Sequence, residues 1–327
     1  MTSEEKLLKD LILIESQSNH EKDICNFIYN LLTKSGFKTI KNPVDANGFN
    51  IIAALGEPKV YLAGHLDTVS PFLDYRETKT HIFGRGACDT KGSVASMITA
   101  ATNCKTKKLT NFGLIFTVGE EKDFRGARKI VASKMPLPFV VVGEPTALKV
   151  VNGHFGILVI KLSAQGKAAH SSQPQKGINA ITILLEAVNS VNSLEIHPES
   201  LTSLVQISGG TADNVIPAEA SAVFSFRISP ADNTDYFQKI KALVSKKVTV
   251  DKTIDIKSVY TQVPEQLSFI KERLVVKYCT ELSLFKNGIV LGPGDISFAH
   301  GANEQISKTE LSEAVKCYST IIENFSK

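Results

Sequence analysis

The sequence predicts an α/β protein with a mainly parallel sheet flanked by helices and a smaller α+β domain inserted into it. Three observations lead to this fold class. At 327 residues, the chain exceeds the roughly 250–300 residues at which a single hydrophobic core stops growing. Short apolar runs alternate with helix-length segments in the first half. The pattern then changes near residue 150, so two domains are expected.

The N-terminal segment predicts two amphipathic helices. Apolar side chains recur at helical spacing in one stripe over residues 7–12 and in a second over residues 24–32. Ser18 and Glu21 are expected to form a capping box at the start of the second helix. Gly36 is expected to end that helix.

Four apolar runs follow: NIIAALG, KVYLAG, NFGLIFTVG and PFVVVG. The segments between them, which include SVASMITAATNC and RGARKIVASK, are long enough to form helices. Apolar runs of this kind are typical of strands buried on both faces of a parallel sheet. Ligands bind beyond the carboxyl ends of the strands in such sheets, so the functional site is expected there.

Residues 152–257 have a different pattern. Their order of strand, helix, two strands, helix and strand indicates an antiparallel sheet with helices on one face. We expect 152–257 to form the inserted domain, and 1–151 together with 258–327 to form the main domain. After about residue 258 the sequence predicts an amphipathic helix, a short GPGD loop and a closing helix.

Composition argues against several classes of protein. Hydrophobic residues make up 43% of the chain and charged residues 21%, which is typical of soluble globular proteins. The net charge of +4 is mild and no basic block contains interleaved aromatic residues, so nucleic-acid binding is not expected. No apolar run reaches the roughly 20 residues of a membrane span, and the charged N-terminus does not resemble a secretory signal. Five cysteines without a CxxC pair favour a reducing cytosol.

Potential metal ligands directly follow three of the predicted strands, each after a glycine. They are His65 after YLAG, the pair Glu120 and Glu121 after FTVG, and Glu144 after VVVG. Glycine lets the chain turn sharply at the sheet edge and so directs the next side chain into the crevice. Asp89 lies in a fourth glycine-rich turn, GRGACDTKG, before a predicted helix.

Any one of these residues alone would more often be an ordinary solvated loop residue, but together they would crowd negative charge at one sheet edge. Two divalent ions that share a bridging carboxylate would neutralise it. Imidazole and carboxylate ligands without a thiolate favour zinc, with cobalt, manganese or nickel as substitutes. Asp67, two residues after His65, is expected to hold the second nitrogen of the imidazole. One of the two adjacent glutamates would bind metal and the other would handle protons.

These motifs together resemble a known family. GHLDTV, GRGACDTKG, GEE, GEP and the late FAHG stand in the order found in co-catalytic zinc peptidases and N-acyl-amino-acid hydrolases. That clan includes acetylornithine deacetylase, succinyl-diaminopimelate desuccinylase, aminoacylase and glutamate carboxypeptidase. The motifs span nearly the whole chain. The resemblance implies a zinc-peptidase-like catalytic domain with an inserted lid and dimerisation domain, and therefore a homodimer.

The resemblance also implies a role for each residue of the metal centre. Glu120 would be the general base. The ligands of one ion would be His65 and Glu144, those of the other would be Glu121 and His300, and Asp89 would bridge the two.

Residues of the inserted domain and of a late loop match the family's substrate site. His170 in GKAAHSS matches a histidine that stabilises the oxyanion in the partner subunit's active site. Asn214 and Arg227 match positions that hold the substrate carboxylate. The glycines of GPGD, Gly292 and Gly294, would bring backbone amides close to the substrate, although a plain loop uses the same residues. Outside the family, His170 would be an ordinary turn histidine and Arg227 a surface strand residue.

The segment GPGDISFAHGANEQIS is most similar to the branch that deacetylates acetylornithine or acetyl-lysine in arginine and lysine biosynthesis. The expected substrate is therefore a small N-acylated amino acid, either free or linked to an amino-group carrier protein. Desuccinylase or dipeptidase activity is the alternative among enzymes. A metal-binding relative without catalysis is a further alternative, which the intact Glu120 and the five candidate ligands disfavour.

Overall fold

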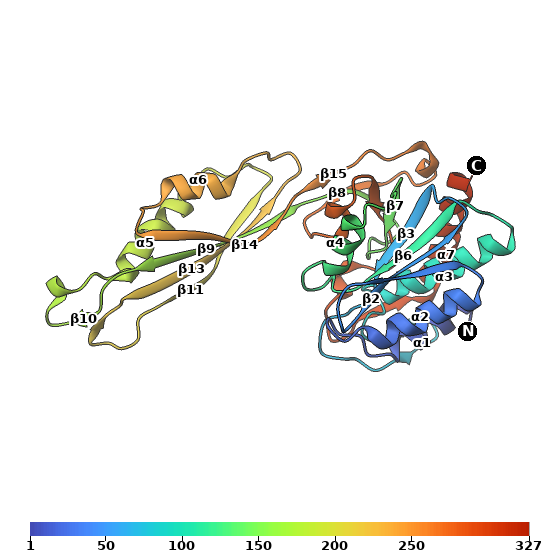
Figure 1. Ribbon diagram of the computed structural model, residues 1–327, viewed down its shortest axis with the longest axis horizontal. Coiled ribbons are helices and arrows are strands. Elements are labelled where there is room, and N and C mark those ends of the chain that lie inside the picture. Colours follow the sequence, from blue (N-terminus) through green and yellow to red (C-terminus); the bar gives the residue numbers. More distant parts are fainter. Residues whose placement is uncertain (327) are drawn as a thin grey trace. The chain divides into compact units, whose positions relative to one another are not determined.

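The computed structural model describes residues 1–326 and divides them into two compact units. The first unit comprises Met1–Gly153, Thr261–Val275 and Thr280–Lys327, and the second comprises His154–Tyr260 and Val276–Cys279. The second unit is thus inserted into the first (Figure 1).

The first unit is built on a mixed sheet whose centre is parallel. Strands β6, β3, β7 and β17 run parallel to one another, and β2 and β8 pair with them antiparallel at either side. In order across the sheet, the strands are β1 (Lys38–Pro43), β2 (Phe49–Leu55), β6 (Phe112–Thr117), β3 (Val60–His65), β7 (Val140–Val142), β17 (Gly288–Val290) and β8 (Val150–His154). Every residue of β3 and β6 is buried, which confirms the expected parallel core.

Helices flank this sheet and form its core with it. Helices α1 (Ser3–Ile12), α3 (Lys91–Thr106) and α7 (Lys308–Ser326) pack against one another, and α3 and α7 also pack on β3 and β6. Helix α2 (Lys22–Lys34) lies on β1 and β2, and α4 (Arg125–Ala132) also contacts β2. The apolar stripes predicted for the first two helices are buried in the core. A small antiparallel sheet of β18 (Gln305–Ser307), β5 (His81–Phe83) and β4 (Arg76–Glu77) completes the unit.

Two local predictions differ from the structure, and one strand was not predicted. The Ser18 hydroxyl donates to the carboxylate of Asp67 at 2.7 Å instead of capping α2, whose N-cap Glu21 makes no side-chain capping bond. Strand β1 was not predicted, because none of its residues is buried and Ile40 is its only aliphatic one apart from Pro43. No α-helix precedes the GPGD loop in the described chain after Ser258. That segment forms β16 (Arg273–Val276), which pairs with β8, and short 3-10 turns at Glu265–Leu267 and Glu281–Leu284.

The second unit is a four-stranded antiparallel sheet with two helices on one face. The strand order is β11 (Leu201–Gly209), β13 (Glu219–Ile228), β9 (Gly156–Gln165) and β14 (Val248–Ile256). Helices α5 (Ala180–Asn192) and α6 (Tyr236–Leu243) cover it and lie on the same side of the sheet in Figure 1. Short strands β10 (Ala169–His170) and β12 (Val215–Ile216) form a separate pair, and β15 (Val259–Tyr260) follows β14. This arrangement agrees with the predicted order of strands and helices.

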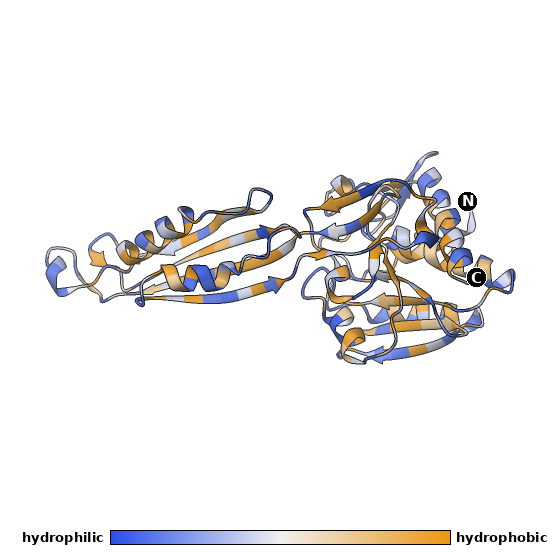
Figure 2. Cartoon of the chain, turned by 90° about the horizontal axis from the view of Figure 1, so that it is seen from above, coloured by the Kyte–Doolittle hydropathy of each residue, from blue (hydrophilic) through white to orange (hydrophobic). Residues whose placement is uncertain are grey.

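Hydropathy follows the two architectures. The central strands of the first unit are almost continuously hydrophobic, whereas β9 and β13 alternate because only one of their faces lies under the helices (Figure 2). Within residues 1–326, no helix has both the length and the apolar composition needed to cross a bilayer.

Candidate metal centre

The residues at the strand ends come together as the sheet topology requires. His65 is the last residue of β3, Glu120 and Glu121 lie in the turn after β6, and Glu144 lies just after β7. Because β6, β3 and β7 are parallel neighbours, their carboxyl ends meet at one edge of the sheet. Asp89 reaches the same edge from the turn that leads into α3.

The Asp89 carboxylate lies between two imidazoles. Its Oδ1 is 3.1 Å from Nε2 of His65, and its Oδ2 is 3.2 Å from Nε2 of His300. Each imidazole has a second carboxylate beside it. Glu144 Oε1 is 3.6 Å from Nε2 of His65, and Glu121 Oε1 is 2.9 Å from Nε2 of His300. Asp89 thus has one histidine and one glutamate on each of its two sides. This set of nitrogen and oxygen donors fits two cations.

Burial adds to the case that these residues fit metal ions. His65, Asp89 and Glu121 each offer an atom within 4.8 Å of the other two. The side chains of His65 and Glu144 are only 1% and 7% exposed. Oε1 of Glu144 has no hydrogen-bond partner among the described residues, and an unpaired buried oxygen of this kind is costly unless a cation or proton meets it.

Electrostatics in the site favour positive charge. Burial raises the pKa of Glu144 well above its usual value. Burial alone would lower the pKa of His65, but the charges of Glu144 and Asp89 raise it well above the usual value. Hydrogen bonds to Asp89 and Glu121 raise the pKa of His300 to about 10. Glu144 and both imidazoles thus hold protons more firmly than usual, which indicates a site that attracts cations.

Glu120 is placed in the same electrostatic field without pairing with a histidine. Burial raises the pKa of its carboxyl well above the usual value, and the negative charges of Glu281, Glu121 and Asp89 add to the effect. A carboxyl whose pKa lies closer to neutrality can both accept and return a proton.

Asp67 has a different role from the predicted one. The main-chain carbonyl of Asp67, at 2.8 Å, accepts the Nδ1–H of His65, while the Asp67 carboxylate lies 3.7 Å away from that nitrogen. The carboxylate instead accepts the amide of Glu120 at 2.9 Å and that of Glu121 at 3.2 Å. His65 is still oriented with Nε2 toward Asp89, but the Asp67 side chain shapes the turn that contains the two glutamates.

Glu281, which no sequence pattern indicated, also lies near this site. Its side chain is fully buried, and Oε2 accepts the Thr117 hydroxyl at 2.9 Å. Burial raises the pKa of Glu281 to about 7. No pattern could have identified it, because its segment was expected to be part of an amphipathic helix.

Both glycine amides of the GPGD loop donate hydrogen bonds within the chain. The Gly292 amide donates to Oγ1 of Thr146 at 3.2 Å, and the Gly294 amide donates to Oε1 of Glu310 at 3.0 Å. Both glycines are buried. A Cβ on Gly292 would lie 2.5 Å from the Glu144 carbonyl oxygen, so close packing explains this glycine. The substrate role of Gly292 and Gly294 stays a prediction, and these two amides already have acceptors within the chain.

The three predicted lid residues lie in the second unit, at two separate places. His170 on β10 is exposed, and the amide of the next residue, Ser171, donates to the Asn214 carbonyl at 2.9 Å. Asn214 precedes the first residue of β13, whereas Arg227 lies near the last residue of that strand. The ten residues of β13 span about 30 Å. Within one chain, Asn214 and Arg227 are thus too far apart to hold the same carboxylate.

Comparison with known proteins places this architecture in a family. Residues 152–251 match the model of the peptidase dimerisation domain, and residues 50–147 match that of peptidase family M28. A relative named "probable carboxypeptidase" from Aspergillus clavatus is 31% identical over 360 residues, which cover 96% of this chain and 87% of that protein. A peptidase M20 domain-containing protein of Schizosaccharomyces pombe is 31% identical, with 97% of this chain and 83% of that protein covered.

Solved structures agree with this placement at the level of the fold. The aminopeptidase PepT from Bacillus cereus superposes with a TM-score of 0.85 at 19% identity, covering 99% of this chain and 98% of that chain. The YXEP protein of Bacillus subtilis, described as a dinuclear metal-binding peptidase from the M20 family, superposes with a TM-score of 0.76 at 13% identity, covering 98% and 96%. The chain belongs to the M20 family of metallopeptidases.

Proposed function

We propose that this chain is a two-metal hydrolase that cuts the amide bond between an acyl group and an amino acid with a free carboxylate. One observation supports this most directly: the Asp89 carboxylate lies between His65 and His300, 3.1 and 3.2 Å from their Nε2 atoms. Two co-catalytic ions share a bridging ligand in this way.

His65 and Glu144 would hold one ion, Glu121 and His300 the other, and Asp89 both. The absence of a thiolate favours zinc, with cobalt as a substitute. When bound, the two ions supply Lewis acidity, which lowers the pKa of a water molecule and polarises the amide carbonyl.

Glu120 handles the proton in this proposal. Its amide is fixed by the Asp67 carboxylate, and its own carboxyl lies in the field of the metal ligands without a histidine partner. Such a group can take a proton from water and return it to the leaving amine. The turn that contains Glu120 also contains the ligand Glu121, so the base and the metal are positioned by one short segment.

For the substrate, the curated relatives and the motifs of this chain point to the same bond. The relatives are named carboxypeptidases, and a carboxypeptidase breaks the amide bond to the last amino acid of a peptide. Deacetylation of acetylornithine or acetyl-lysine breaks the same bond with a smaller acyl group. We propose the acetylated amino acids, free or on an amino-group carrier protein, as the substrate class. Short peptides are the second candidate, which the names of the relatives favour.

We further propose that the active form is a cytosolic homodimer joined through the second unit, because that unit matches a dimerisation domain and the five cysteines of the sequence form no CxxC pair. Strand β11 forms one edge of its sheet and exposes several large apolar side chains, which a second copy could cover. They are Leu201, Leu204, Val205 and Ile207. His170, also in this unit, would then serve the partner's site.

One experiment tests the substrate and the metal together. Protein loaded with zinc or cobalt is assayed against acetylornithine, acetyl-lysine, acetylcitrulline, succinyl-diaminopimelate and simple dipeptides, with and without chelator. We expect chelator-sensitive turnover, highest for an acetylated amino acid. Turnover of dipeptides alone would favour the peptidase alternative, and no turnover of any substrate would contradict the proposed activity.

A further inference from the structure

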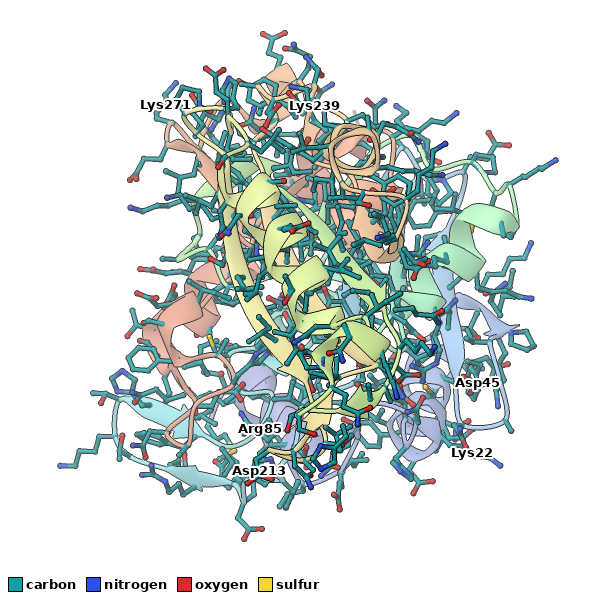
Figure 3. The ribbon with its side chains drawn as sticks, turned by 90° about the vertical axis from the view of Figure 1, so that its left-hand side faces the viewer. Lys22, Asp45, Arg85, Asp213, Lys239 and Lys271 are labelled. Atoms are coloured by element: carbon teal, nitrogen blue, oxygen red, sulfur yellow. The ribbon has the colours of Figure 1, made fainter. Side chains whose placement is uncertain are left out.

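A buried ion pair lies directly behind the proposed metal ligands. The side chains of Arg85 and Glu304 are 2% and 1% exposed, and Nη1 of Arg85 lies 2.7 Å from Oε2 of Glu304. Arg85 is labelled in Figure 3. Burial of an ion pair alone adds little to stability, since apolar side chains of similar volume often do as well. The remaining hydrogen bonds of the pair therefore indicate its role.

Glu304 holds the main chain of the turn that contains Asp89. Its Oε1 accepts the amide of Asp89 at 3.0 Å and that of Cys88 at 3.1 Å. Two hydrogen bonds to one charged oxygen fix the direction of this short segment more firmly than a neutral acceptor would. The proposed bridging carboxylate is thus positioned from the C-terminal part of the chain.

Arg85 connects the same pair to the loop that contains His300. Its Nη1 also donates to the carbonyl of Gly301 at 3.3 Å, and its Nε donates to the carbonyl of Pro71 at 3.0 Å. His300 itself is half exposed and does not lie on a strand or helix. The loop that presents it therefore depends on these anchors and on β18, whose Gln305 pairs with Phe83 of β5.

We propose that the Arg85–Glu304 pair positions Asp89 and His300 relative to each other, and so sets the affinity of the ion held by Glu121 and His300. This inference rests on the two-metal function proposed above. The other ion shares Asp89 but should depend on the pair less, because its two remaining ligands are held elsewhere. His65 ends a fully buried strand and is held by the Asp67 carbonyl, and the chain beside Glu144 is fixed by the Gly143 amide, which donates to the Ala63 carbonyl at 2.7 Å.

The test is a titration of the metal-free full-length protein with zinc. Binding is measured by calorimetry or by competition with a chelator dye. Wild type should bind two ions. Glu304→Gln keeps the size of the side chain but removes the charge, and Arg85→Gln removes the other partner. In each variant we expect the affinity for one ion to fall about 10- to 100-fold, as is usual when a residue behind a metal ligand is changed. The affinity for the other ion should fall by a smaller factor, since that ion shares Asp89 but not His300.

Asp232→Asn is the matched control. Asp232 is a buried carboxylate in the second unit, where it accepts hydroxyl hydrogen bonds from Ser200 and Tyr236 at 2.7 Å each. This control should lower the melting temperature of the metal-free protein while both zinc affinities stay at the wild-type value. Asp232→Asn thus shows what the loss of a buried hydrogen-bonded carboxylate does to stability alone. Any fall in zinc affinity seen only in the Arg85 and Glu304 variants then comes from the metal centre.

Arg85→Lys keeps the charge and removes the fork that reaches the Gly301 and Pro71 carbonyls. It should fold even where Glu304→Gln does not, and should weaken the same single ion. Wild-type affinity for both ions in Arg85→Lys and in the folded Gln variants would overturn the inference, as would an equal loss of both ions. A wild-type protein that binds fewer than two ions would overturn the two-metal centre, and the inference with it.

Discussion

The carboxylate of Asp67 accepts the main-chain amide of Glu120 at 2.9 Å, while the carbonyl of the same residue accepts Nδ1–H of His65 at 2.8 Å. One residue thus fixes a proposed metal ligand through its backbone and the proposed general base through its side chain. The two functions can be separated by mutation, because a change of side chain leaves the carbonyl in place.

Asp67→Asn should therefore lower kcat about 10- to 100-fold while the ion held by His65 and Glu144 still binds with near-wild-type affinity. The lost charge weakens the hydrogen bonds that hold the Glu120 turn, and the His65 orientation persists. Steady-state kinetics and zinc content per chain check this. Ser18→Ala, which removes only the hydroxyl donor to Asp67, should have a smaller effect. If Asp67→Asn loses zinc without a change in kcat per bound zinc, the Asp67 carboxylate orients His65 after all.

Glu120→Gln should lower kcat by about 10²- to 10⁴-fold, because an amide cannot transfer the proton. Zinc content and KM should change little, since Glu120 has no histidine partner in the metal centre. Turnover and zinc content are measured for this variant beside Glu57→Gln, which removes an exposed glutamate elsewhere in the first unit. Activity of Glu120→Gln equal to that of the control would remove Glu120 from the mechanism.

The metal-free protein should show a pH dependence that depends on His300. Hydrogen bonds to Asp89 and Glu121 raise the pKa of His300 from 6.5 to about 10. Between pH 6.5 and about 10, the folded chain keeps the proton on His300, whereas the unfolded chain releases it. The stabilisation is therefore complete below pH 6.5 and is lost as the pH rises through 10.

Urea unfolding of chelator-treated wild type and His300→Ala, at a series of pH values, measures this contribution. The difference between their free energies of unfolding should shrink steadily toward high pH. A difference that stays constant across the window would mean that His300 is not held as an imidazolium between the two carboxylates.

Charges placed on β11 should separate the dimer. Val205 and Ile207 are 52% and 54% exposed on this edge strand, so lysines there would be buried against a second copy. Val205→Lys/Ile207→Lys should be a folded monomer by light scattering and should lose most of its activity, since His170 is proposed to act in the partner. Ile254→Lys, on the opposite edge strand β14, should remain a dimer. A fully active monomer would contradict the role of His170.

The sequence predicted the strand-end ligands because a simple physical rule connects them. A glycine after a buried strand directs the next side chain to the carboxyl edge, and parallel neighbours share that edge. His65, Glu144 and the pair Glu120 and Glu121 follow this rule. His300 does not follow a strand, and only the resemblance to a family indicated it.

Other features depended on contacts that no local pattern contains. Asp67 lies two residues from His65 and was expected to hold the imidazole through its carboxylate, but the turn after β6 supplies two competing amides. Glu304 and Arg85 are 219 residues apart, and nothing at either position indicates the other. The segment around Val275 contains enough apolar residues for an amphipathic helix, yet pairing with β8 makes it a strand.

The most direct test of the two-metal centre is anomalous X-ray diffraction from crystals of the zinc-loaded protein. Two anomalous peaks are predicted, one beside His65 and Glu144 and the other beside His300 and Glu121, with the Asp89 carboxylate between them. A single peak, or zinc bound away from Asp89, would contradict the account.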